Sequence, residues 1–253
     1  MSSTLIGVIA LGCLFGGALL GMRLRFSLPG HHLTDESRHL IEIGLGIVGT
    51  MAGLVLGLLV GSATGSYNAQ RNELLDASSR TVLLDRLLAH YGPQANDARQ
   101  TLRVAVVATL NRMWPHEGVG GPQVDPSAVR GEIVLDKIED LTPTTDTQRT
   151  IKQEALGQAI AIAQVRWLMF EQTGSGVSWP LLILLIFWFT ITFTGFGLFA
   201  PQNATVSVAL LLAALAVSGA IYVMLAMYSP FEGVVQLSSA PLREALAHLG
   251  APP

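Results

Sequence analysis

The sequence predicts an all-helical, polytopic membrane protein with four transmembrane helices and a helical cytosolic domain inserted between the second and the third. Half of the 253 residues are hydrophobic and only 13% are charged, whereas roughly 25% are charged in soluble domains. Four apolar runs are long enough to cross a bilayer, at residues 4–22, 40–66, 180–200 and 204–228. The alternation typical of β-strands is missing from the sequence.

Charge and cysteine content narrow the function classes. The formal net charge is −3 and the basic residues form no cluster, so we exclude a nucleic-acid-binding protein. Cys13 is the single cysteine and lies in the first apolar run, which excludes an intrachain disulfide and a cysteine-based zinc site. The adjacent pair His31 and His32 does not face one site on a helix, so we expect interfacial histidines there and no metal or cofactor.

The first apolar run is interpreted as a retained anchor, because no basic residue precedes it and no A-x-A cleavage site follows it. Gly12 and Gly16 lie one helical turn apart, and Gly17 and Gly21 repeat this offset. Small residues at this spacing allow two membrane helices to approach closely. We therefore expect this helix to pack tightly against another.

The second apolar run carries a glycine at every fourth position: Gly49, Gly53, Gly57, Gly61 and Gly65. Such spacing places them all on one face of a helix. The face serves either for close helix packing, within one subunit or between copies, or for lining a narrow path across the bilayer; the spacing by itself favours packing. Glu42, near the start of the run, either reaches the headgroups or lies at the mouth of a polar path.

Residues 67–178 have the composition of a soluble helical domain. A helix beginning near the N-cap Thr34 should continue from the membrane into this domain, because no helix breaker separates Gly65 from Gly92. Further helices are expected at residues 96–114, at 133–141, and from Thr145 or Asp146 to about residue 172. Residues 117–126 should form a surface loop, and Gly174 and Gly176 a hinge.

The remaining segments complete the predicted domain order of 1–66, 67–178, 179–229 and 230–253. Thr190 and Thr194 share a face of the third span, and we favour hydroxyls bonded to their own helix over a polar stripe facing water or ions. A small amphipathic helix begins at Pro241 and is expected on the membrane surface or on the helical domain.

Five segments, taken in order around the four spans, resemble the bacterial bestrophin-like domain family, which is distantly related to bestrophin anion channels. These segments are LPGHHLTDESRHLIEIGLGIVGTMAGLVLGLLVGSA, LLDRLLAHYGPQANDAR, LNRMWP, FWFTITFTGFGLFAPQN and YSPFEGVVQLSSAPL. The resemblance covers nearly the whole chain. It implies a homo-oligomer, a pentamer in the bestrophin channels, with a pore lined by the second membrane helix and a cytosolic vestibule built by the central helices.

By this resemblance the candidate pore-lining residues are Glu42 near one mouth and Thr50, Leu54, Gly57, Leu58 and Gly61 along the wall. Five other glycines are candidates for helix packing: Gly49, Gly53, Gly65, Gly12 and Gly16. One departure is clear: bestrophin channels narrow the pore with aromatic and branched apolar side chains, whereas this helix offers glycine, leucine and valine. No acidic cluster matches their calcium clasp, so calcium gating is not implied.

Two functions follow as hypotheses. The first is an oligomeric channel for inorganic anions, chloride above all; the alternative is a membrane-anchored signalling or scaffold module without conductance. An enzyme is not expected, because it would need an ionisable or nucleophilic pair inside the spans. Apart from Glu42 near one end and the lone Cys13, the spans hold no such group. A transporter is disfavoured by the few spans and by the lack of a charged midplane site.

An even number of spans places both termini and the central domain on one side of the membrane. Basic residues flank the spans at both ends, so the positive-inside rule does not choose that side. We expect the bacterial inner membrane with a cytoplasmic central domain, because this domain is large and has no disulfides. The expected partners are membrane lipid, further copies of the chain and inorganic anions.

Overall fold

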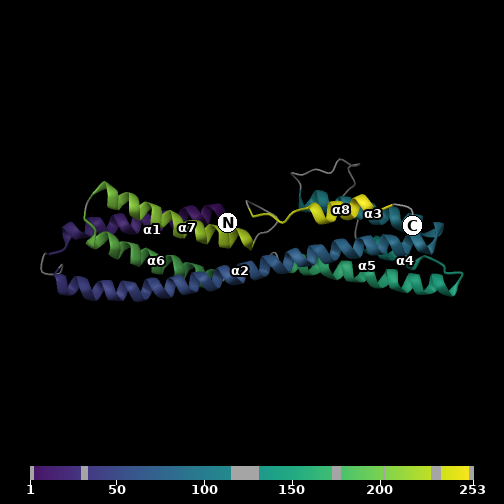
Figure 1. Ribbon diagram of the computed structural model, residues 1–253, viewed down its shortest axis with the longest axis horizontal. Helices are drawn as coiled ribbons and strands as arrows, with labels where there is room; N and C mark the ends of the chain where they lie inside the picture. The colour runs from purple at the N-terminus through teal and green to yellow at the C-terminus, as the bar shows by residue number, and fades with distance from the viewer. Residues whose placement is uncertain are drawn as a thin grey trace. The chain divides into compact units, whose positions relative to one another are not determined.

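The computed structural model describes residues 3–29, 34–114, 131–172, 178–201, 203–228 and 235–250. Every element within these ranges is helical, which confirms the all-helical prediction. In chain order they are α1 (Ser3–Ser27), α2 (Asp35–Tyr91), the 3-10 turn η2 (Pro93–Ala95), α3 (Asn96–Met113), α4 (Gly131–Glu139), α5 (Asp146–Gln172), α6 (Trp179–Phe199), α7 (Ala204–Met227) and α8 (Ala240–His248) (Figure 1).

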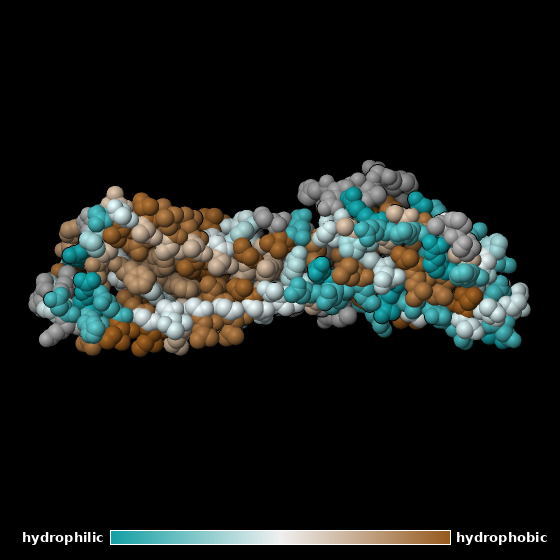
Figure 2. Space-filling view, in the orientation of Figure 1, coloured by the Kyte–Doolittle hydropathy of each residue, from teal (hydrophilic) through white to brown (hydrophobic). Residues whose placement is uncertain are grey.

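Two compact units make up the chain. The membrane unit combines Met1–Tyr67 with Gly176–Val235, and the helical unit combines Asn68–Ser175 with Gln236–Pro253. Helices α1, α2, α6 and α7 are long and apolar enough to cross a membrane, which confirms the prediction of four spans. Apolar side chains dominate the visible surface of the membrane unit, and polar ones are frequent on the helical unit (Figure 2).

Helix α2 runs without interruption for 57 residues, as the absence of a breaker predicted. It begins after Thr34, whose Oγ1 accepts a hydrogen bond from the Ser37 backbone N–H at 3.4 Å. It ends before Gly92, whose φ of 118° lies in a region that glycine adopts without strain. Pro93 follows. It has no backbone N–H, so it cannot donate the hydrogen bond that would extend the helix.

The closest approach in the membrane unit joins α1 and α6. A Cβ added at Gly21 of α1 would collide with the Thr194 carbonyl, and one added at Gly197 of α6 would collide with the Ala18 carbonyl. Backbone therefore meets backbone in both directions, an arrangement that only glycine allows. The expected tight packing of the first helix is confirmed through Gly17 and Gly21.

Large apolar side chains form the core of the membrane unit. The fully buried ones come from three helices: Leu14 of α1, Leu182 and Leu185 of α6, and Ile221 and Met224 of α7. Lipid is as apolar as these side chains, so the contacts stabilise the unit by close van der Waals packing rather than by excluding water.

The hydroxyls of α6 bond within their own helix. Thr190 donates to the Ile186 carbonyl at 2.7 Å, and Thr194 donates to the Thr190 carbonyl at 2.7 Å. This geometry confirms the favoured interpretation of these threonines. Each hydroxyl proton is used, so the pair does not present donors to an ion.

A buried ion pair holds the helical unit together. Asp85 of α2 is 1% exposed and accepts two hydrogen bonds from Arg99 of α3, both at 2.9 Å. The Gly250 N–H, just after α8, donates to the same carboxylate at 3.3 Å. The hydrogen bonds to Asp85 raise the pKa of Arg99 above its ordinary value, so the guanidinium stays charged.

Helix α8 packs in the helical unit, one of the two places expected for it. The indole Nε1–H of Trp114 donates to the Leu237 carbonyl at 2.8 Å, and Leu242 and Ala245 of α8 are buried. Thr145 caps α5 by accepting from the Gln148 N–H at 3.2 Å. The expectations for His31 and His32, for residues 117–126 and for the glycine hinge at 174 and 176 fall outside the described residues.

Candidate functional site

One face of α2 packs against the rest of the membrane unit. The Leu45 side chain occupies the space beside Gly195 of α6, where an added Cβ would collide with it. Ala52 and Ala63 are completely buried in the core. Small residues thus hold α2 against its neighbours along this face.

The opposite face of α2 has no neighbour among the residues that the structure describes. A Cβ added at Gly53, Gly57, Gly61 or Gly65 would meet no atom within 4 Å, and Leu54 and Leu58 are 64% and 68% exposed. Only 6% of the apolar window of α2 is buried, whereas 44% is buried in α1. Of the four apolar helices, α2 is the one that the subunit covers least.

Charge is absent from a long part of this helix. Residues 43–70 contain no Asp, Glu, Lys or Arg. The exposed Thr50 hydroxyl donates to the Gly46 carbonyl at 2.8 Å, so its proton is directed at the helix itself. The uncovered face is therefore a strip of backbone and small or apolar side chains.

Glu42, before this uncharged stretch, is paired. Its Oε1 accepts a hydrogen bond from Arg38 Nε at 2.7 Å, one helical turn earlier, and both side chains are about half exposed. The Arg38 guanidinium also lies 5.8 Å from the centre of the Phe199 ring at the end of α6. An exposed pair of this kind adds little to stability, but Arg38 balances the negative charge of Glu42 next to the uncovered face.

No group of three or more His, Cys, Asp or Glu side chains that could hold a metal ion occurs among the described residues.

The family model for the bestrophin-like domain matches residues 12–242, which reach from α1 into α8. The chain belongs to the bestrophin-like domain family. This confirms the resemblance drawn from the sequence segments. No curated protein and no solved structure matches this bestrophin-like chain, so its residues carry the functional argument.

The structure gathers the candidate pore-lining residues on the uncovered side of one helix. Glu42, Thr50, Leu54, Gly57, Leu58 and Gly61 are all exposed. That these residues line an ion path stays a prediction, because such a path would lie outside a single chain.

The candidate packing glycines divide into two groups. Gly49 has a neighbour in the subunit, since an added Cβ would lie 3.7 Å from Thr192 Cγ2. Gly53, Gly65, Gly12 and Gly16 are exposed, and no atom of the described residues lies within 4 Å of an added Cβ. Packing at these four positions also stays a prediction.

Two glycines of α6 were not singled out from the sequence. Gly195 faces Leu45 of α2, whereas Gly197 faces Ala18 of α1. Residues two apart point to opposite sides of a helix, so this pair serves two contacts and does not fit a small-xxx-small pattern. The richness of α6 in small and hydroxyl residues between positions 190 and 197 was the available signal.

Proposed function

We propose that this bestrophin-like chain assembles into an oligomeric ion channel in which α2 of each subunit lines the ion path. The observation that carries the proposal is the glycine face of α2, which none of the described residues covers. Because this face lies on the outside of the subunit, one subunit by itself cannot enclose an ion path along it. A closed ring of subunits would turn that face inward, and family resemblance suggests five subunits.

A glycine strip gains little from contact with lipid, because it offers few side-chain atoms for packing. Because glycine has no side chain, such a strip suits either a narrow lumen or a close contact between two helices. In the lumen, Leu54 and Leu58 would supply an apolar constriction that gates by losing and regaining its water.

The proposed ions are inorganic anions, with chloride as the probe. Residues 43–70 contain no carboxylate that would repel an anion, and the charge of Glu42 is balanced by Arg38 at 2.7 Å. A cation channel usually presents rings of Asp or Glu, and this stretch of α2 supplies none. We place the channel in the bacterial inner membrane with the helical unit in the cytoplasm.

A scaffold without conductance is the second candidate. The contact between α1 and α6 shows that this chain uses glycine for close backbone packing at Gly21 and Gly197. The glycines of α2 could pack in the same way between copies and seal the bilayer. The helical unit would then recruit a protein partner.

Chloride efflux from liposomes containing the purified protein separates the two functions. Native mass spectrometry of the same preparation counts the subunits. A ring of subunits with anion flux supports the channel. A tight oligomer that passes no ions under varied voltage and pH refutes it and favours the scaffold.

A further inference from the structure

Two side-chain contacts join the uncharged stretch of α2 to the end of α7. The Tyr228 hydroxyl, just after α7, donates to Ser62 Oγ at 3.3 Å. The Thr64 hydroxyl lies 3.6 Å from Met227 Sδ. All four residues belong to the membrane unit, and the two pairs are 166 and 163 positions apart in the sequence. The contacts therefore hold the Ser62 side chain beside α7.

Ser62 lies at the edge of the uncovered face of α2. It follows Gly61, where an added Cβ would meet no described atom within 4 Å, and it comes one helical turn after Leu58, which is 68% exposed. Ser62 is itself exposed. A ring of subunits that turned this face inward would place the Ser62 hydroxyl beside the ion path.

The hydroxyl proton of Ser62 is available, in contrast to those of two threonines in the same stretch. Thr50 and Thr64 donate to backbone carbonyls of their own helix at 2.8 and 2.9 Å. Ser62 is the acceptor in its bond with Tyr228, as expected from the greater acidity of a phenol. A serine hydroxyl that accepts a hydrogen bond keeps its own proton as a donor. Among the described residues, that proton has no acceptor.

The bond from Tyr228 makes the Ser62 hydroxyl a better donor, because successive hydrogen bonds polarise one another. The two hydroxyls thus form a short chain that ends on a proton suited to an anion. Helix α7 ends at Met227, so the negative end of its dipole opposes an anion here. At an exposed helix end that effect is smaller than a hydrogen bond to a charged group, so the hydroxyl prevails.

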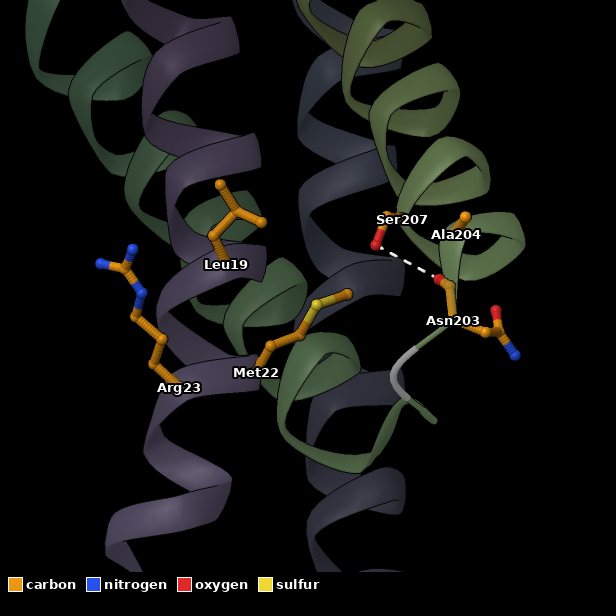
Figure 3. Close-up of a pocket in the computed structure, with 6 residues that line it drawn as sticks. All are labelled: Leu19, Met22, Arg23, Asn203, Ala204 and Ser207. Atoms are coloured by element: carbon orange, nitrogen blue, oxygen red, sulfur yellow. Dashed lines mark hydrogen bonds between the residues drawn. The ribbon is translucent and has the colours of Figure 1, made fainter.

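The beginning of α7 shows the opposite arrangement. Its Ser207 hydroxyl, which lines a cavity between α1 and α7, donates to the Asn203 carbonyl at 3.3 Å. Arg23 lines the same cavity but extends from the side of α1 away from α7 (Figure 3). The hydroxyl proton is used within α7, and the guanidinium does not compensate for it. An anion therefore gains more from Ser62 than from Ser207.

We propose that Ser62 is a specificity-determining residue of the anion path, where its hydroxyl donates a hydrogen bond to the passing anion. The inference rests on the channel function proposed above. Tyr228 is a positioning residue, because it orients and polarises the Ser62 hydroxyl without touching the ion. An anion that enters an apolar path loses part of its water shell. This loss is larger for chloride than for the weakly hydrated thiocyanate, so the Ser62 donor favours chloride.

Reversal potentials in planar bilayers, with chloride on one side and thiocyanate on the other, test the proposal by giving the permeability ratio of the two ions. Ser62→Ala should lower the ratio of chloride to thiocyanate at least about threefold, through the loss of one donor to a charged group. Tyr228→Phe should lower it in the same direction by less, because Ser62 remains. Thr64→Val is the matched control: it removes a hydroxyl whose proton serves its own helix and should leave the ratio unchanged.

Native mass spectrometry of each variant shows whether the oligomer is intact. If the Ser62–Tyr228 bond only held α2 against α7, the substitutions would loosen the oligomer or leave it unaltered but would not change the ratio. A conducting Ser62→Ala protein with an unchanged ratio therefore overturns the inference and leaves the channel in place, as does a Thr64→Val change of equal size. If Ser62→Ala does not assemble, an unchanged ratio in Tyr228→Phe overturns it. An unaltered protein that carries neither ion refutes the channel itself, and the role of Ser62 with it.

Discussion

Replacing Gly57 with leucine separates the possible roles of the uncovered face. Among the described residues, a Cβ at this position meets nothing within 4 Å, so the substitution should not destabilise the fold of one chain. Any destabilisation must arise from contacts outside one chain. If Gly57 faces the lumen, chloride flux should fall at least about tenfold through a narrowed constriction, with the oligomer intact.

If Gly57 instead packs against another copy, the contact between α1 and α6 indicates how much free energy the substitution would cost. There, a Cβ at Gly21 would run into the backbone of Thr194, and overpacking of this kind costs about 1–3 kcal/mol. A similar collision at Gly57 between copies would weaken association by up to the order of 100-fold per contact. Liposome flux measures the loss of conductance, and native mass spectrometry measures the loss of association. A Gly57→Leu protein that is both fully assembled and fully conducting would refute this reasoning.

Three further substitutions test the remaining contacts. Asp85→Ala removes the carboxylate that pairs with the mostly buried Arg99 guanidinium and should lower the free energy of unfolding by about 3 kcal/mol in a denaturant titration of the detergent-solubilised protein. Asp146→Ala, which removes an exposed pair, should lower it by less than about 0.5 kcal/mol. Equal losses in the two variants would contradict the assignment of a buried pair. Trp114→Phe removes the bond to the Leu237 carbonyl, costs about 1–2 kcal/mol, and should speed proteolysis near α8; an unchanged cleavage rate counts against that contact. Thr194→Val should leave ion flux within about twofold of the unaltered protein, because the hydroxyl serves only its own helix; a large drop would mean that it faces ions.

Local signals made the helix boundaries predictable. The caps at Thr34 and Thr145 and the break at Gly92 each depend on residues close in sequence, and the structure reproduces them. The uninterrupted course of α2 was predictable for the same reason, because no breaker occurs within it.

Contacts between distant segments were harder to predict. The Asp85 carboxylate binds groups 14 and 165 residues away, and a single charged residue on an amphipathic helix gives no sign of such partners. Gly197 likewise depends on where α1 crosses α6. These pairings follow from the tertiary arrangement, which residue spacing on one helix does not specify.

The candidate site was predictable only in part. The glycine spacing on α2 was visible in the sequence, and the structure adds that Gly57 and its neighbours are uncovered in the subunit. Neither the glycine spacing nor the structure of one chain selects between a lumen and helix packing, because both proposed roles involve contacts beyond one chain.

Cysteine accessibility tests the central claim, that this face of α2 lines the anion path. Cys13 is the only cysteine, so a Cys13→Ser protein gives a background without thiols for Gly57→Cys and for the control Ala52→Cys, whose native side chain is completely buried. We predict that a negatively charged methanethiosulfonate reagent modifies Gly57→Cys and reduces its chloride flux, and that Ala52→Cys is unaffected. Complete modification of Gly57→Cys, verified by mass, with unchanged chloride flux would contradict the claim.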